Sequence, residues 1–207
     1  MSEFISSTFG KISGRHGTAV AMKSKKTGKT YLRLHSVPSD PKTAKQIAHR
    51  AKFGFVNKEM NCMRNLFKIT FGDNHGVSHG ISLAFGAVTG DYPDFSMDFS
   101  KLIIAQGGLN TSSFLNITKT NGTTLKFEWD TTVGFQGDDN DGVNIVLLND
   151  QNRVGLLKQN IVVRGEGTVD IELPAVWAGQ KVHCWIYFSS PDGVNTSESQ
   201  FIETVQL

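Results

Sequence analysis

The 207-residue chain contains few of the residues that mark secreted, disulfide-stabilised or membrane-spanning proteins. Its two cysteines, Cys62 and Cys184, lie far apart and form no CxxC pair, so we expect both to be reduced thiols inside a core. No stretch approaches the roughly 18 consecutive apolar residues of a membrane span. Residues 1–14 lack the apolar core of a signal peptide, which predicts an intracellular, soluble protein without a membrane partner.

Each candidate motif for cofactor or metal binding in the sequence is incomplete. Residues 27–30 (TGKT) end like a phosphate-binding loop, but the first glycine of that motif would fall on Lys23. Residues 138–142 (DDNDG) resemble a calcium loop, yet in register with it the twelfth ligand position becomes Leu148. His75 and His79 stand one helical turn apart, without a nearby cysteine or an HExxH glutamate to complete a zinc site. We therefore expect no cofactor and no metal.

Signals for nucleophilic catalysis are equally sparse. The sequence contains no GxSxG elbow. His183 and Cys184 are neighbours in a predicted strand, so their side chains face opposite sides of the sheet and cannot form a nucleophile–base pair. These observations predict that the protein is not an enzyme; a weak metal-dependent enzyme remains the least favoured alternative.

The chain does contain a strong asymmetry of charge. Residues 1–70 hold 14 Lys+Arg and 3 Asp+Glu, whereas residues 71–207 hold 7 and 16, so net charges of +11 and −9 lie behind an overall charge of +2. A basic segment with interleaved aromatic residues favours polyanions or acidic protein surfaces as partners. Charge asymmetry is thus the main functional signal in the sequence.

Two elements are predicted in the basic half. Alternating residues at 18–22 and 30–34, joined by the glycine-containing SKKTGK loop, predict a β-hairpin with a basic tip. Asp40 followed by Pro41 predicts a helix beginning at Pro41, because Asp is a good N-cap and Pro fits the first helical position. Apolar residues recur every three or four positions from Ala44 to Leu66, with Gly54 predicted to kink or shorten the helix. A second helix is predicted over residues 77–88.

From Leu102 onward, short alternating runs separated by Gly, Asn and Asp predict an antiparallel β-sandwich. The expected strands are residues 125–129, 143–148, 159–164, 169–173, 181–188 and 201–205, with a turn at Pro191–Gly193 between the last two. Trp129 and Trp185 are the predicted anchors of its core. We expect an α+β chain with a basic hairpin and helical region over residues 1–99 and a sandwich over residues 100–207 that folds alone.

Seven motifs spread along nearly the whole chain are Gly10-x-x-x-Gly14-x-x-Gly17, Lys29 to Arg33, Pro41-x-Thr43-x-x-Gln46-x-x-x-Arg50-x-Lys52-Phe53, Phe127-x-Trp129, Leu173-Pro174, Val182-His183 and Ser197-x-Ser199. Together they resemble a family of uncharacterised proteins common in Bacteroidota, which is known only as a domain of unknown function. The resemblance implies a bacterial origin and an immunoglobulin/fibronectin-like C-terminal sandwich, but it assigns no activity and no functional residue. His16 and Met22 depart from the pattern.

Three functional hypotheses follow from the charge. In the first, a non-catalytic structural subunit self-associates into a homo-oligomer, or docks on a larger particle, through its basic segment and acidic sandwich. In the second, the basic segment binds nucleic acid. In the third, the two halves pack against each other within one chain and the lysines only confer solubility. The expected contact residues are Arg15, Lys23, Lys25, Lys26, Lys29, Arg33 and Arg50, with Asp138, Asp139 and Asp141 as the acidic partner face. The expected location is the cytoplasm, or a virion if the protein is phage-derived.

Overall fold

The computed structural model describes residues 13–36, 39–40 and 42–207. Its contacts divide the chain into two compact units, residues 1–43 (unit 1) and residues 44–207 (unit 2). The division falls between Thr43 and Ala44, whereas the sequence suggested a boundary at residue 100. The boundary differs because the helices share a core with the four-stranded sheet.

Unit 1 contains a three-stranded antiparallel sheet of β1 (Gly14–His16), β2 (Ala19–Lys23) and β3 (Thr30–Leu34), in the order β1-β2-β3. The pairing of β2 with β3 confirms the predicted basic hairpin, with Ala19 opposite Leu34 and Lys23 opposite Thr30. The strand β1 pairs with the other edge of β2. Gly17 has φ +60°, the left-handed conformation that a tight turn between β1 and β2 needs.

The first helix of unit 2, α1 (Ala44–Glu59), begins three residues later than predicted. Pro41, the predicted start, lies outside the described residues. The Asp40 carboxylate accepts the backbone N–H of Lys42 at 3.3 Å, so it caps a local turn and not the helix. Lys42 has φ +47°, which lies outside the right-handed helical region and delays the helix.

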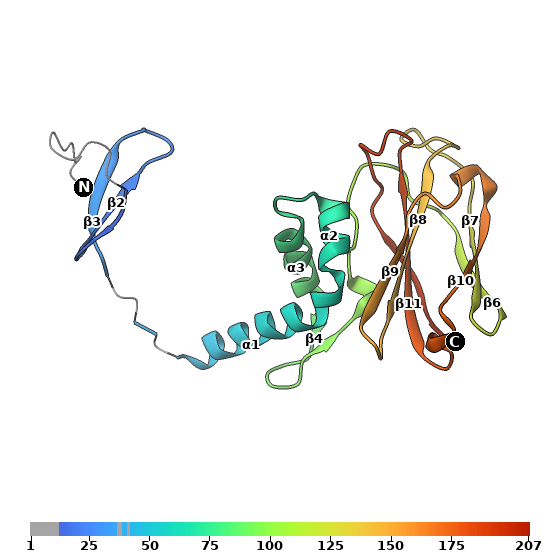
Figure 1. Cartoon of the computed structure of the whole chain (residues 1–207), viewed down its shortest axis with the longest axis horizontal. Helices are drawn as coiled ribbons and strands as arrows, with labels where there is room; N and C mark the ends of the chain where they lie inside the picture. Colours follow the sequence, from blue (N-terminus) through green and yellow to red (C-terminus); the bar gives the residue numbers. More distant parts are fainter. Residues whose placement is uncertain (1–12, 37–38, 41) are drawn as a thin grey trace. The chain divides into compact units, whose positions relative to one another are not determined.

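The helical layer of unit 2 continues through a 3₁₀ turn, η1 (Met60–Met63), into α2 (Arg64–Phe71), and then into α3 (Gly76–Gly86). The predicted kink or shortening at Gly54 is wrong, because this glycine lies within α1, and Figure 1 shows the change of direction between α1 and α2. The predicted second helix is confirmed as α3. Gly80 of α3 permits close packing on α2, since a Cβ there would lie 2.4 Å from the ring of Phe67. Among the described residues, no helix has both the length and the apolar character that a membrane crossing requires.

A short hairpin of β4 (Val88–Thr89) and β5 (Ser96–Met97), followed by η2 (Phe99–Lys101), leads into two sheets. The three-stranded sheet has the order β10-β7-β6 and the four-stranded sheet the order β12-β11-β8-β9. Their strands are β6 (Leu115–Asn121), β7 (Thr124–Trp129), β8 (Gly142–Asn149), β9 (Val154–Lys158), β10 (Thr168–Glu172), β11 (Lys181–Ser189) and β12 (Gln200–Gln206). Two 3₁₀ turns, η3 (Arg164–Glu166) and η4 (Ala175–Trp177), precede β10 and β11.

The two sheets pack face to face as a β-sandwich, because side chains from both share one core. Phe127 and Trp129 of the three-stranded sheet lie in this core with Ile145 and Ile186 of the four-stranded sheet. The predicted turn at residues 191–193 is confirmed, since Gly193 N–H donates to Ser190 C=O at 2.8 Å between β11 and β12. This part of the chain is therefore an antiparallel sandwich, as its sequence pattern predicted.

In the sandwich, one strand, β6, was missed and another was misplaced. No strand forms over the predicted residues 159–164, where Asn160 has φ +44° and Arg164 begins a 3₁₀ turn. The preceding residues form β9 instead. Its sequence, VGLLK, does not alternate, and β6 (LNITKTN) buries only Ile117, so neither showed the period-two pattern of a half-buried strand.

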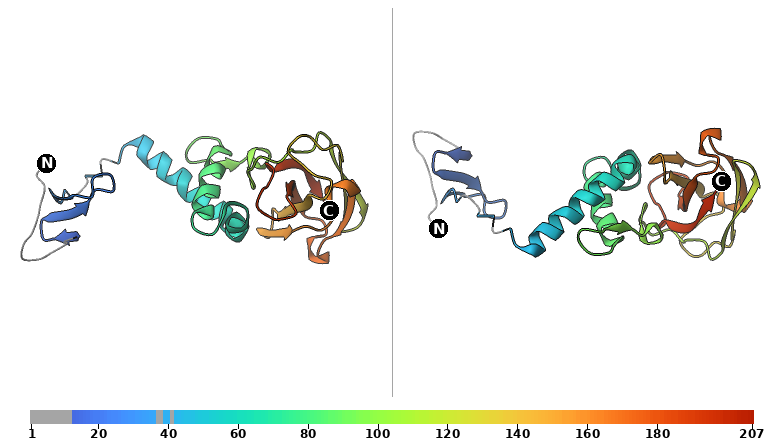
Figure 2. Two further views of the ribbon diagram at one scale, coloured as in Figure 1. Left: turned by 90° about the horizontal axis from the view of Figure 1, so that it is seen from above. Right: turned by 90° about the horizontal axis from the view of Figure 1, so that it is seen from below.

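The two central strands of the four-stranded sheet, β8 and β11, are buried on both of their faces. Val146 and Leu148 of β8 and Trp185 of β11 face away from the sandwich interior and share a second core with Phe67 of α2 and Ala84 of α3. Figures 1 and 2 show the helices on the side of this sheet away from the three-stranded sheet. The boundary suggested at residue 100 therefore divides a continuous core. Trp185 anchors the helical layer and not the sandwich interior, where Trp177 accompanies Trp129.

Candidate functional site

The basic sheet of unit 1 places two of the predicted contact residues on one face. Arg15 of β1 and Arg33 of β3 both pair with Val20 of the central strand, and paired residues of an antiparallel sheet point to the same side. Met22 and Tyr31, which pair with each other two residues further along, share that face. The result is an arginine–aromatic face, with the two arginines separated by two interstrand spacings, about 10 Å.

The other predicted lysines of unit 1 lie at the hairpin tip. Ser24 N–H donates to Lys29 C=O and Gly28 N–H donates to Ser24 C=O, both at 2.9 Å, which closes the loop. Lys25 and Lys26 are exposed on this loop. Lys23, the last residue of β2, falls on the opposite face from Arg15. Arg50 lies on α1 and so belongs to the other compact unit. The predicted basic set is therefore divided among both faces of a sheet, a loop and a helix.

The predicted acidic face contains one residue that cannot contact a partner. Asp141 is only 1% exposed, and its carboxylate accepts the backbone N–H of Asp138 at 2.9 Å. Asp138 and Asp139 are exposed, although Asp138 also accepts the backbone N–H of Asn140 at 2.8 Å. The sequence could not separate these three aspartates, because charge alone does not reveal which carboxylate turns inward. The acidic face is reduced to Asp138 and Asp139.

A buried arginine beneath this loop was not foreseen. The guanidinium of Arg164 donates to Asn110 C=O at 2.7 Å, to Thr111 C=O at 3.1 Å and to Thr132 C=O at 3.2 Å. It also lies over the ring of Phe188, 4.3 Å from the centroid. Burial lowers the pKa of Arg164, and the nearby carboxylate of Asp141 opposes that shift. Arg164 therefore fixes the loops at this end of the sandwich, and its sequence context carried no signal of that role.

A groove of about 680 Å³ lies on the helical layer of unit 2. Its wall includes Phe53 of α1, which is 54% exposed, and Phe85 of α3. The ring of Phe85 contacts His49 at a centroid distance of 5.2 Å and Lys52 Nζ at 4.3 Å. Its other lining residues are Asn57, Arg64, Asp73, Asn74, His75, Val77, Ser78, Ile81 and Ser82. The groove thus combines an apolar floor with a rim of mixed charge, where Arg64 and the adjacent Lys52 accompany one carboxylate, Asp73.

A second, more polar cavity of about 500 Å³ contains both histidines of the HGVSH segment. His79 Nε2 lies 3.4 Å from Gln106 Oε1, and its ring meets Phe71 edge-on at 5.0 Å. His75 precedes α3 and lines both cavities. Within the described part of the chain, no group of three or more His, Cys, Asp or Glu side chains is placed to hold a metal ion.

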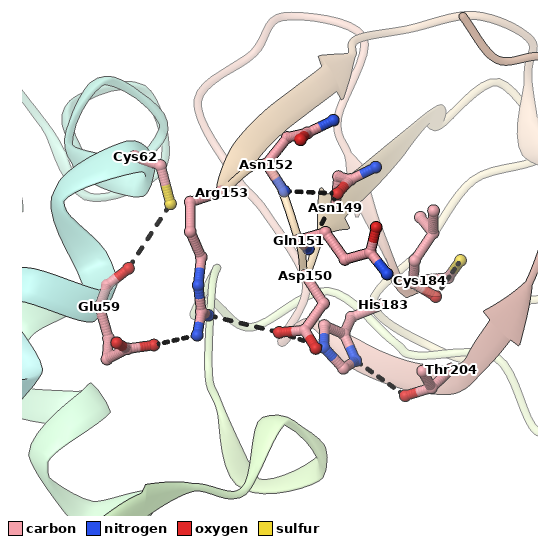
Figure 3. Close-up of polar contacts among 11 residues, drawn as sticks. Glu59, Cys62, Asn149, Asp150, Gln151, Asn152, Arg153, His183, Cys184 and Thr204 are labelled. Atoms are coloured by element: carbon pink, nitrogen blue, oxygen red, sulfur yellow. Dashed lines mark hydrogen bonds and ion pairs between the residues drawn. The ribbon is translucent and has the colours of Figure 1, made fainter. Parts of the chain in front are cut away.

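A chain of polar contacts joins α1 to the four-stranded sheet (Figure 3). Arg153 bridges Glu59 of α1 at 2.6 Å and Asp150 at 3.5 Å. Asp150 Oδ1 lies 3.7 Å from His183 Nε2, and His183 Nδ1 lies 2.8 Å from Thr204 Oγ1. The order of carboxylate, imidazole and hydroxyl resembles a catalytic relay, but none of these side chains lines the grooves described above. This cluster links the helical layer to the sheet.

The environment of His183 favours the neutral form of its imidazole over the charged form. Burial is the main cause that lowers the pKa of His183, while Asp150 opposes the shift. The ring of Phe99 stacks on the imidazole at 3.9 Å. Cys184, on the opposite face, lies in the sandwich core, which confirms that the two neighbours do not pair. Both cysteines are free thiols, and burial raises the pKa of each.

The solved structures with low similarity to this chain include two contactin fragments. The first contains the FN1–FN3 domains of chicken CNTN1; it is 11% identical with a TM-score of 0.37, covering 50% of this chain and 33% of that one. The second, an fn3 domain of human contactin 1, is 6% identical with a TM-score of 0.32, covering 49% and 78%. This chain thus spans about a third of the first fragment.

No curated protein matches the chain. One family model matches residues 11–203, which include the basic sheet, the helical layer and almost all of the sandwich. Both charged regions described above therefore lie within the matched sequence. The chain belongs to the Family of unknown function (DUF6266).

Proposed function

We propose that this protein is a non-catalytic assembly subunit, which associates head to tail with further copies of itself or docks on a larger particle. The observation that carries the proposal is the distribution of charge over the fold. Residues 44–86, the helical layer, hold 6 Lys+Arg and 2 Asp+Glu, whereas residues 87–207 hold 7 and 15. Residues 1–43, the other compact unit, are also basic, with 8 Lys+Arg and 2 Asp+Glu.

This polarity favours contact between unlike surfaces of two copies. Because the basic and acidic residues belong to different parts of one chain, the favourable pairing is heterologous, and heterologous contacts produce rings or filaments. Lys25, Lys26, Asp138 and Asp139 are all exposed on loops, where a partner can reach them. Rim charges of this kind act mainly on the association rate and on partner choice.

Self-association should therefore depend on salt and on the sign of the loop charges. The mass distribution of the protein would be measured by light scattering at about 50 and 500 mM NaCl, since screening shortens the reach of surface charges at high salt. We expect oligomers at low salt and smaller species at high salt. Reversal of Lys23, Lys25, Lys26 and Lys29 to Glu should shift the distribution towards the monomer.

A complementary variant supplies the control. The variant Asp138→Lys/Asp139→Lys should also self-associate poorly, but a mixture of the two charge-reversed proteins should recover association, because complementary charge is restored between unlike copies. Asp141 is left unchanged since it is buried. Wild-type protein that stays monomeric at high concentration and low salt would contradict self-association.

Nucleic-acid binding is a second candidate, favoured by the arginine–aromatic face of unit 1. Arg15 and Arg33 can contact phosphates there, while Tyr31 on the same face can stack on a base. A single-stranded oligonucleotide would be titrated at salt concentrations from about 50 to 200 mM, where phosphate contacts weaken steeply. Arg15→Gln/Arg33→Gln should weaken binding more than the control Lys25→Gln/Lys26→Gln. Equal losses in both variants would argue against a specific face.

Two finer assignments accompany this proposal. We infer that the sandwich is immunoglobulin/fibronectin-like, which its strand order supports: β6, β7 and β10 form one sheet, and β8, β9, β11 and β12 the other. We also infer a bacterial protein of the cytoplasm or of a phage particle, as the motif resemblance implies. Fractionation of the native host would test the location.

A further inference from the structure

We propose that Phe135 of one copy inserts into the groove between α1 and α3 of the next copy. This inference rests on the proposed assembly function and names the contact that would join the copies. Its two halves are an exposed aromatic side chain on the loop between β7 and β8 and the apolar groove of the helical layer.

Phe135 is the most exposed large apolar side chain among the described residues. It belongs to the GFQG segment, residues 134–137, at the tip of a loop. A fully exposed aromatic ring gains more than most side chains from burial in a partner, and anchors of this type dominate binding energies at interfaces. This feature identifies Phe135 as the projecting half of a contact.

Hydrogen bonds hold the loop that carries Phe135 in place. Gln136 N–H donates to Asn110 Oδ1 at 2.7 Å, and Asn110 N–H donates to Gln136 C=O at 2.9 Å. The carbonyl groups of Asn110 and Thr132 in turn accept hydrogen bonds from the buried guanidinium of Arg164. Because both sides of the loop are tied to a buried group, less ordering is needed when Phe135 binds.

The groove has the size and lining that an aromatic anchor requires. Its volume of about 680 Å³ exceeds what one phenyl ring fills, so adjacent loop atoms can enter with the ring. Phe53, Val77, Ile81 and Phe85 provide apolar contacts. The exposure of Phe53, at 54%, leaves an aromatic surface open for a partner.

Charge complementarity selects a second copy as the occupant. Asp138 and Asp139 follow Phe135 by three and four residues on the same loop and are exposed. Arg64 lines the groove, and Lys52 Nζ sits over Phe85 at its wall. One carboxylate, Asp73, also lines the groove. The rim therefore attracts an acidic loop because its two cations outnumber this carboxylate, not because all of its charges are positive.

The contact is heterologous, since the projecting loop and the receiving groove are different surfaces. The loop begins at β7 of the three-stranded sheet, whereas the groove lies on helices that pack against the outer face of the four-stranded sheet. Each copy therefore presents one intact projection and one intact groove. Repetition of the contact would extend a chain of subunits or close a ring.

Two variants remove one half of the contact each. Phe135→Ser removes the projection, and Ser82→Trp fills the groove from an exposed position on α3. Phe53→Asp is a second groove variant, which removes apolar surface and repels Asp138 and Asp139. Val176→Ser is the matched control, because Val176 is 74% exposed but lines neither surface. Thermal unfolding of each variant would verify that it folds.

The expected results are specific to a heterologous contact. Light scattering at low salt should show oligomers for wild type and for Val176→Ser, and at least about a tenfold weaker self-association for each contact variant, as for an interfacial anchor. A mixture of Phe135→Ser with Ser82→Trp should form dimers, because one intact groove meets one intact projection. A double variant that carries both changes should stay monomeric even when mixed with itself.

Two outcomes would overturn the inference and distinguish it from failure of the proposed function. If wild type associates in a salt-dependent manner but Phe135→Ser and both groove variants associate equally well, copies meet elsewhere and only the named contact is wrong. If each contact variant is monomeric and their mixture is monomeric too, the loop and groove do not bind each other. Wild type that never associates would overturn self-association and this contact together.

Discussion

The two sheets of the sandwich differ in what covers their outer faces. The strand β7 alternates strictly, with Leu125, Phe127 and Trp129 buried and the intervening residues partly exposed. Every residue of β8 is buried, because the sandwich core covers one face and the helical layer the other. Strands covered on both sides show continuous rather than alternating apolar sequence. The helices are therefore a third layer of the packed structure and not an attached connector.

Removal of the helical layer should therefore have the largest effect. A chain truncated to residues 100–207 would expose Val146, Leu148, Trp185 and Tyr187, which share the core with the helices. We expect it to aggregate or to lack cooperative unfolding, since burial of apolar surface is the dominant stabilising contribution. Circular dichroism and thermal melts would measure this.

Residues 44–207 are the control for the truncation. This longer chain retains every residue of the compact unit and should unfold cooperatively. If residues 100–207 instead folded with the same midpoint as residues 44–207, the sandwich would be independent, as its sequence alone suggested. The helices would then contribute little to the common core.

Much of this architecture could be predicted from sequence because periodicity reports local burial. The hairpin of unit 1, α3 and the strands β7, β8, β10, β11 and β12 all followed from spacing and turn residues. The partner of each apolar face could not be predicted in this way. Trp185 and Trp129 both lie on strands, and only the tertiary structure shows that one contacts helices and the other the opposite sheet.

The candidate site was less predictable than the fold. The charge asymmetry identified exposed Lys25, Lys26, Asp138 and Asp139, but it also selected Asp141, whose carboxylate turns inward. Neither the groove nor Arg164 had a local signature, because a groove is formed by residues distant in sequence and a buried arginine looks like any surface arginine. The sequence position of a charged residue does not show whether its side chain is exposed or buried.

Substitution of the two tryptophans would compare how much each of the two cores contributes to stability. Trp129→Ala and Trp185→Ala, each in the full chain, should each lower the free energy of unfolding by roughly 3–5 kcal/mol, as large-to-small core changes do. Both side chains are nearly inaccessible, at 4% and 0% exposed. Urea unfolding would measure the losses. A small loss for Trp185→Ala alone would mean that the helical face is not a true core.

Two glycines test how tightly the helical layer is packed. Gly80→Ala would place a Cβ 2.4 Å from the fully buried ring of Phe67 and should cost about 1–3 kcal/mol through overpacking. Gly54→Ala is the matched control within α1, where a Cβ meets nothing within 4 Å. That change should stabilise the protein by roughly 0.5–1 kcal/mol through helix propensity. Equal effects of both changes on urea unfolding would contradict the close contact of α2 with α3.

The smallest expected effect is a pH dependence at the junction of the helical layer with the four-stranded sheet. Burial, reinforced weakly by Arg153 and Lys181, keeps the pKa of His183 below that of an unfolded histidine, and Asp150 only partly opposes it. The unfolded chain therefore binds this proton more readily than the native chain. Stability from this group is complete above the unfolded pKa, about 6.5, and is lost as the pH falls from there towards the native pKa.

The loss cannot exceed about 1.4 kcal/mol per pH unit, the limiting slope for one proton. Urea unfolding at several pH values between about 5 and 7.5 would show it, with His183→Gln as the comparison because that variant carries no titrating ring. The difference between the two proteins isolates His183 from carboxylates such as Asp98 and Glu128, whose pKa values are lowered and which destabilise the fold at more acidic pH. Parallel curves for the two proteins would show that His183 does not couple protonation to the packing of the helices on the sheet.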